Sequence, residues 1–151
     1  MALKGYFKGE YEHTIDAKGR MFIPAKFRDG LGENFVILKW MFNNSLYLMT
    51  EEVFADFAAS LSDLPLTNED ADTVRLAIFS QANDAETDAQ NRLLIPQEFR
   101  RYANLDKEVV VVGVGTHIEI WDRNTWRNKT MEPDKVRAAL SNLRSSGLTV
   151  R

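Results

Sequence analysis

The 151-residue chain contains no cysteine, which excludes disulfide bonds and thiolate metal sites and fits a reducing cytoplasm. Its apolar runs are far shorter than the roughly 20 residues of a transmembrane helix, and its first residues lack the apolar core of a secretory signal peptide. It also lacks a Walker loop, a nucleophile motif and any metal-ligand spacing. We therefore expect a cytoplasmic protein that is not an enzyme, binds no metal or cofactor and has no membrane partner.

Histidine is scarce as well, with only His13 and His117. Neither has a cysteine or a cluster of carboxylates near it in the sequence, which a metal site would require. We predict that both are strand or surface residues rather than ligands.

What the chain does contain is a repeated segment. Residues 16–28 read DAKGRMFIPAKFR, and residues 88–100, 72 positions later, read DAQNRLLIPQEFR; seven of these thirteen positions are identical. The same offset aligns residues 46–48 with residues 118–120, without a gap. A constant register over this length indicates a duplicated structural unit.

Each copy reads as strand, turn, strand, short helical turn, hairpin and helix. Gly19 and its counterpart Asn91 suit a turn position with positive φ. The proline five residues later can begin a helical turn. This turn would carry Phe27 inward in the first copy and Phe99 in the second.

Two apolar runs predict strands that are buried on both faces, FVIL at residues 35–38 and VVVV at residues 109–112. Each begins a hairpin, which turns at Asn43-Asn44 in the first copy and at residues 113–116 in the second. Helical spacing of apolar residues predicts helices over three segments, residues 51–64, 69–81 and 133–144.

A unit of about 45 residues buries too little apolar surface to be stable alone. We therefore expect a mainly β chain with connecting helices (α+β), in which the two copies pair their strands into one pseudo-dimeric barrel. The predicted boundaries are 7–56 for the first repeat, 57–78 for a helical connector, 79–128 for the second repeat and 129–151 for a C-terminal helix and tail.

The net charge of −3 argues against a nucleic-acid-binding protein, but the charge is unevenly distributed. Residues 1–28 hold six bases against three acids, whereas residues 50–80 hold one base against seven acids. In the second copy, residues 84–101 hold three bases against four acids. The first copy therefore offers the more basic surface.

The paired Asp-x-x-x-Arg motifs, each followed by two apolar residues and Ile-Pro, resemble the MraZ family. The resemblance runs from Phe7 to about Lys129 and includes the stretch WD-x-x-x-W that begins at Trp121. Two motifs in register, with this aromatic stretch after them, are far more specific than a single Asp-x-x-x-Arg. The second motif departs from the pattern, because Gln90 and Asn91 stand where a basic residue and glycine are common.

The resemblance implies two AbrB-like swapped-hairpin halves and a ring-shaped homo-oligomer. It also implies a sequence-specific, nucleoid-associated regulator that binds double-stranded DNA. The expected target is short direct repeats upstream of its own operon, the division and cell-wall gene cluster, where such proteins usually act as repressors.

The site residues follow from the two motifs. Arginine can bridge a phosphate or bind guanine bidentately, and lysine supplies a point charge to phosphate. We predict that Asp16 and Asp88 orient the arginine of their own turn. The predicted DNA-binding residues are the basic side chains in and after the motifs, Lys18, Arg20, Lys26, Arg28 and Arg92.

Other interpretations stay open at this point. The Asp16–Arg20 pair can serve only to fix the turn, and Arg28, which recurs as Arg100, can pair with an acid at a subunit interface. For the whole chain, the alternatives are a ring-forming structural or interaction protein without DNA binding, and a swapped-hairpin antitoxin whose C-terminal tail binds a toxin.

Overall fold

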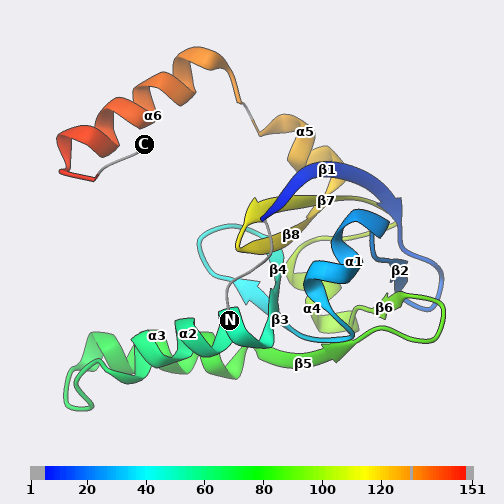
Figure 1. The fold of residues 1–151 in the computed structure, drawn as a ribbon, viewed down its shortest axis with the longest axis horizontal. Helices are drawn as coiled ribbons and strands as arrows, with labels where there is room; N and C mark the ends of the chain where they lie inside the picture. Colours follow the sequence, from blue (N-terminus) through cyan, green and yellow to red (C-terminus); the bar gives the residue numbers. More distant parts are fainter. Residues whose placement is uncertain (1–5, 130, 149–151) are drawn as a thin grey trace.

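The two copies fold into the same order of elements in the computed structural model, which describes residues 6–129 and 131–148 (Figure 1). Residue 130 and residues 149–151 of the predicted C-terminal segment lie outside the described residues. The first copy contains β1 (Phe7–Thr14), β2 (Arg20–Phe22), α1 (Ala25–Leu31), β3 (Asn34–Trp40) and β4 (Ser45–Thr50). The second contains β5 (Ala82–Glu86), β6 (Arg92–Leu94), α4 (Gln97–Tyr102), β7 (Glu108–Gly115) and β8 (His117–Asp122). The remaining helices are α2 (Glu51–Ser62), α3 (Glu69–Ser80), α5 (Arg123–Asn128) and α6 (Pro133–Ser145).

The copies exchange strands. One antiparallel sheet has the order β1-β7-β8-β4-β3-β5, so the first strand of each copy pairs with the third strand of the other. At the centre, β4 pairs with β8, and β2 pairs with β6 in a separate ribbon. Tyr47 lies opposite Glu119, and Met21 lies opposite Leu93. Because each of these pairs joins equivalent positions of the repeat, a local two-fold axis passes through both.

This arrangement confirms the mainly β fold of two swapped-hairpin halves with connecting helices. The sheet, however, ends at β1 on one side and β5 on the other, and these two strands are not paired. Among the described strands, backbone pairing thus forms an open sheet and a ribbon instead of a closed barrel. Side chains close the core, between the sheet and the layer formed by the β2–β6 ribbon, α1 and α4.

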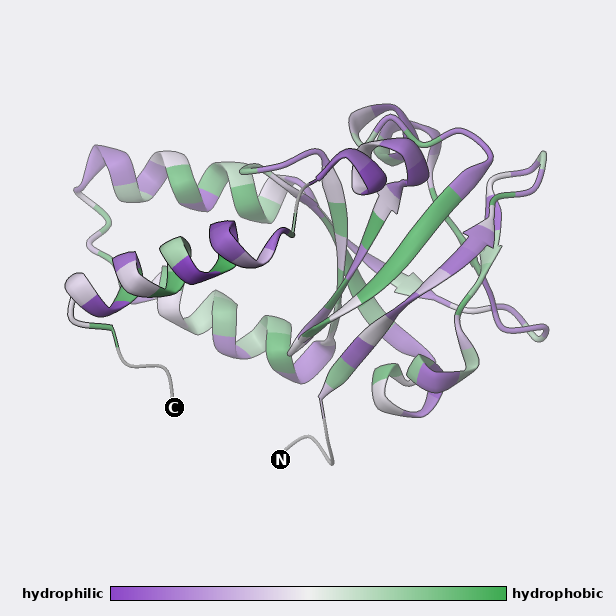
Figure 2. Ribbon diagram, turned by 90° about the horizontal axis from the view of Figure 1, so that it is seen from above, coloured by the Kyte–Doolittle hydropathy of each residue, from purple (hydrophilic) through white to green (hydrophobic). Residues whose placement is uncertain are grey.

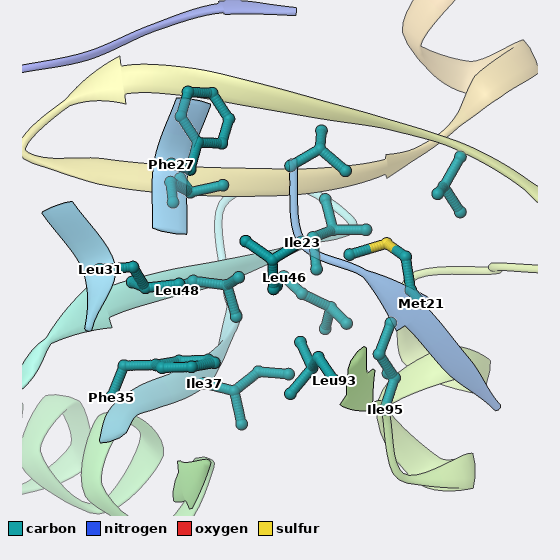
Figure 3. Close-up of a cluster of buried hydrophobic side chains, with 14 of the residues drawn as sticks. Met21, Ile23, Phe27, Leu31, Phe35, Ile37, Leu46, Leu48, Leu93 and Ile95 are labelled. Carbon is teal, nitrogen blue, oxygen red and sulfur yellow. The ribbon is translucent and has the colours of Figure 1, made fainter. Parts of the chain in front are cut away.

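The buried core confirms the prediction that Phe27 and Phe99 point inward. Phe27 and Phe99 are 2% and 1% exposed. Met21 and Leu93, the middle residues of the ribbon, point into the same cluster as Phe35 of β3 (Figure 3). These two residues therefore fix the ribbon to the core, and this determines which of its side chains face outward.

The offset between the copies changes within the repeat. Leu38 pairs with Tyr47 and Val112 pairs with Glu119, so β3 and β7 correspond at an offset of 74 residues, whereas β4 and β8 correspond at 72. The expectation of a register without a gap was wrong here. The second copy has a longer loop before β7 and a shorter hairpin turn after it, because β7 continues through Gly115, into the turn predicted at residues 113–116.

The outer face of the sheet is covered by α2 and α3 over the first half and by α5 over the second. The predicted helices are confirmed to within two residues at each end. Thr50 caps α2 and Asn68 caps α3 through side-chain oxygens, while Arg75 donates to carbonyl oxygens in the last turn of α2 and in the loop that follows it. In the part of the chain that the structure describes, no helix is long and apolar enough to cross a membrane.

Candidate nucleic-acid interface

The first Asp-x-x-x-Arg motif folds into a turn that its own aspartate holds closed. Asp16 Oδ1 accepts the backbone amides of Lys18 and Arg20, each at 2.9 Å. Asp16 Oδ2 accepts Arg20 Nε at 2.8 Å. Gly19 takes a φ of 87°, as predicted. The backbone and the arginine are thus both held by one short carboxylate.

The second motif repeats this geometry. Asp88 Oδ1 accepts the amides of Gln90 and Arg92 at 2.9 Å, and Asp88 Oδ2 accepts Arg92 Nε at 2.9 Å. Asn91 takes a φ of 62°, which asparagine tolerates better than most residues. Two different sequences between aspartate and arginine therefore give the same rigid turn.

Pairing of β2 with β6 places the two turns side by side. Ile23 N donates to Asn91 O at 3.1 Å, and Ile95 N donates to Gly19 O at 2.9 Å, so the strand leaving each turn is bonded to the other turn. Both turns project at the same end of the molecule, away from α2 and α3, in both views (Figures 1 and 2). The duplication thus builds one face from two motifs.

Each motif arginine keeps part of its donor capacity. The ion pair with aspartate uses Nε, and in the described residues no hydrogen bond occupies the terminal Nη atoms of Arg20 or Arg92. The two side chains are 30% and 22% exposed. The aspartates therefore hold Nε and leave the terminal amino groups able to donate hydrogen bonds to an anion or a base edge.

The aspartates are charged at neutral pH. Hydrogen bonds from the backbone amide and then the guanidinium of Arg20 hold the pKa of Asp16 below its usual range. The amides of Arg92 and Gln90, together with the Arg92 guanidinium, lower the pKa of Asp88 in the same way. The ion pair between each aspartate and its arginine is therefore present under physiological conditions.

Arg28 has a different environment from the motif arginines. Its Nε donates to Ile23 O at 3.0 Å, and Arg100 Nε donates to Ile95 O at the same distance. Each Nε is thus bound to the carbonyl that precedes the proline, and pairing of Arg28 with an acid at a subunit interface stays a prediction. Arg100 also lies against the first turn, where a Cβ at Gly19 would come within 2.9 Å of its Cζ.

The remaining basic residues distinguish the copies. Lys18 and Lys26 are exposed, and their counterparts at the 72-residue offset are Gln90 and Glu98. Both motif arginines, Arg20 and Arg92, line a groove with acidic residues of the second copy, Asp84, Glu86 and Asp88. The face is therefore more positive on the side of the first copy.

Sequence reasoning missed a buried polar cluster on the opposite face of the sheet. Glu119 is only 8% exposed and accepts from His117 Nε2 and Trp121 Nε1, both at 2.8 Å. Burial would raise the pKa of Glu119, but the hydrogen bonds from His117, Trp121 and Tyr47 outweigh it and lower that pKa. The one sequence signal is a glutamate in the strongly apolar strand HIEIWD.

Comparison with known proteins identifies the family. The family model of the MraZ protein matches residues 6–76 and 78–139. The transcriptional regulator MraZ of Carboxydothermus hydrogenoformans is 46% identical over 122 residues, which covers 81% of this chain and 85% of the relative. Two further regulators of the same name are similar over most of this chain. The one from Moorella thermoacetica is 46% identical over 135 residues, which covers 89% of this chain and 94% of the relative. The one from Leuconostoc mesenteroides is 45% identical over 126 residues, which covers 83% of this chain and 87% of the relative. The chain belongs to the MraZ family.

Proposed function

We propose that this chain is a DNA-binding transcriptional regulator that contacts duplex DNA through the β2–β6 ribbon and its two turns. One observation carries the proposal: two arginines, Arg20 and Arg92, each held by its aspartate through Nε, lie on a single face, and no hydrogen bond within the described residues occupies their terminal amino groups. The names of the relatives, which are transcriptional regulators, support the same role.

A two-stranded ribbon has the dimensions to enter the major groove of B-DNA, and β-ribbons are an established means of reading it. An arginine held at Nε presents its two Nη groups as a fixed pair of donors, which matches guanine O6 and N7 or two oxygens of one phosphate. Since both arginines are fixed by their own turns, little side-chain entropy is lost when they bind.

The lysines supply the contacts that do not depend on sequence. Lys18 and Lys26 are exposed beside the first turn, where they would reach phosphates on either side of the groove. The acidic helices α2 and α3 lie at the other end of the molecule (Figures 1 and 2). An overall negative chain can therefore still approach DNA with a locally positive face.

The finer parts of the proposal concern target and assembly. We propose that the chain acts in the cytoplasm, on the nucleoid, and represses its own division and cell-wall operon by binding short direct repeats upstream of it. Several copies, assembled as a ring, would engage several repeats at once. Weak single contacts then add up to useful affinity through effective concentration.

A salt titration tests this function. We would measure the affinity of the wild type for its own upstream DNA, and for random duplex, at several salt concentrations. We expect the logarithm of affinity to fall linearly with the logarithm of salt, by about 0.9 per phosphate contacted. Arg20→Ala is expected to lose about 10- to 100-fold, the range for one bidentate contact to a base.

The control is Arg144→Ala, which removes the same charge from the exposed surface of α6. It should bind the upstream DNA as the wild type does. If the wild type shows no preference for that DNA over random duplex, or if Arg20→Ala binds as tightly as Arg144→Ala, the proposed interface fails. A ring without DNA binding would then be the better account.

A further inference from the structure

The outer side of the β2–β6 ribbon carries two exposed apolar side chains. Because side chains alternate along a strand and Met21 and Leu93 are buried, the neighbouring residues face away from the core. Phe22 is 50% exposed and Leu94 is 58% exposed. With the two motif arginines they form a patch of four residues, called here the ribbon patch: Arg20, Phe22, Arg92 and Leu94.

The ribbon patch has a regular layout. Phe22 lies directly opposite Arg92, and Leu94 lies directly opposite Arg20. Each arginine is therefore flanked across the ribbon by an apolar side chain, with about 5 Å between their Cβ atoms. The two halves are related by the local two-fold axis through Met21 and Leu93.

The folded core does not require these apolar residues. Each lies next to a buried residue of its own strand, and neither belongs to the buried clusters of the described residues. A polar residue in place of Phe22 or Leu94 would keep the alternation of buried and exposed side chains along the strand. Large exposed apolar side chains between two charged donors need a role at the surface.

The major groove offers a partner for this combination. Guanine presents the acceptors O6 and N7, and thymine presents a C5-methyl group that apolar side chains contact. An arginine with an apolar neighbour about one base step away matches a guanine beside a thymine. A protein partner would match the apolar residues, but the Nη groups beside them, which have no hydrogen-bond partner among the described residues, favour an acceptor-rich ligand.

We infer that Phe22 and Leu94 are specificity-determining residues, which contact thymine methyl groups next to the bases bound by Arg20 and Arg92. The inference rests on the proposed function, since it requires the ribbon to lie in the major groove. It also assigns the second copy a direct part in reading DNA, although its lysine positions are occupied by Gln90 and Glu98.

Replacement of thymine by uracil tests this inference, because uracil lacks only the methyl group. We would prepare the upstream duplex with thymine and with uracil, and measure binding of the wild type and of Phe22→Ser and Leu94→Ser. The wild type should lose about fourfold in affinity for each contacted methyl, the factor that corresponds to about 0.8 kcal/mol. In each serine variant, replacement of thymine by uracil in one half of the site should no longer change the affinity.

The control variant is Phe42→Ser, which removes an exposed aromatic side chain in the β3–β4 turn, outside the ribbon patch. It should keep the full preference for thymine, and all variants should keep the thermal midpoint of the wild type. Since each variant is measured on both duplexes, any general effect of uracil on duplex shape cancels.

Two results would overturn the inference while leaving DNA binding intact. Either the wild type binds the uracil duplex as tightly as the thymine duplex, or Phe22→Ser and Leu94→Ser lose the same factor on both. Absence of binding to either duplex would instead overturn the proposed function itself, so the two failures are distinguishable.

Discussion

At the scale of single residues, Asp16 uses both of its oxygens within its own turn. One oxygen accepts two backbone amides and the other accepts Arg20 Nε. A short carboxylate suits this task, because it can bond to backbone two residues further on. Asp16 and Arg20 therefore form one hydrogen-bonded unit, and this geometry is compatible with both interpretations of the pair, a fixed turn and an oriented arginine.

The pKa of Asp16 gives a pH prediction. Folding favours the charged form, so the stabilisation is complete above the usual aspartate pKa of about 4 and is lost as pH falls through the lower pKa of the folded chain. We expect an NMR titration of the Asp16 carboxyl carbon to show this lowered midpoint. In Arg20→Ala most of the lowering should persist, because the backbone amide of residue 20 contributes most. A return to the usual value would contradict this origin.

Substitution of Asp16 separates its two roles. Asp16→Asn keeps an oxygen for the backbone amides but loses the charge that holds Arg20, whereas Asp16→Ala loses both. We expect DNA affinity to fall in the order wild type, Asp16→Asn, Asp16→Ala. Equal affinity of all three in the same binding assay would mean that the orientation of Arg20 has no part in binding.

Glu119 offers a prediction on stability. Trp121 Nε1 and the Tyr47 hydroxyl both depend on its carboxylate, and burial, followed by the charge of Glu119, raises the pKa of Tyr47. Glu119→Leu would leave buried donors without an acceptor, so we expect a loss of roughly 2 to 4 kcal/mol in the free energy of unfolding by urea. Glu119→Gln keeps one acceptor and should lose less. An unchanged midpoint for Glu119→Leu would contradict this role.

At the scale of elements, the exchange of β1 depends on one close approach. Gly113 of β7 lies opposite Gly9 of β1, and a Cβ at Gly113 would come within 2.2 Å of the Lys8 backbone nitrogen. A glycine in an extended strand is usually improved by alanine, by about 0.4 to 1 kcal/mol. Here backbone atoms occupy the space, so the steric effect dominates.

We therefore expect Gly113→Ala to displace β1 and to lower the free energy of unfolding by more than 2 kcal/mol. Hydrogen exchange should increase first in the amides of β1, which pair with β7. The matched control is Val112→Ala, in the same strand, which should destabilise without selective loss of protection in β1. If Gly113→Ala were as stable as the wild type, the close approach would be wrong.

Local chemistry explains which elements could be predicted from the sequence. Gly19 and Asn91 indicated positive φ, Phe27 and Phe99 indicated inward positions, and apolar spacing placed the helices within two residues. Each of these features depends on neighbours within a few positions of the chain, where residue types leave few alternatives.

The features that could not be predicted depend on contacts between distant segments. The pairing of β1 with β7 and the change of offset to 74 residues depend on loop lengths that compensate each other across the repeat. At the candidate site, the carbonyl partners of Arg28 and Arg100 are backbone atoms, which no side-chain pattern reveals. The Glu119 cluster likewise joins β8 to β4 across the local two-fold axis.

At the scale of the whole molecule, the two ends have different surfaces. The turns project at one end, while the helices at the other carry mixed hydrophobic and hydrophilic positions (Figure 2). No residue of α6 is buried, although Val136, Leu140 and Leu143 share one of its faces. On α3, Val74 and Leu76 are also exposed. Exposed apolar side chains grouped on a helix are typical of an interaction site.

The proposed ring would cover these helices, which leads to the last prediction. Leu76→Glu or Val136→Glu places a charge on that surface without touching either turn, so we expect smaller assemblies in mass photometry. Affinity for DNA with several copies of the bound sequence should fall by about a hundredfold, because the sites are no longer engaged together. Affinity for DNA with a single copy should stay unchanged, since the ribbon patch is intact. A wild type that is monomeric at micromolar concentration would separate DNA binding from assembly and leave each chain to act alone. A variant that loses affinity equally on both DNAs would instead mean that these helices do not act through assembly alone.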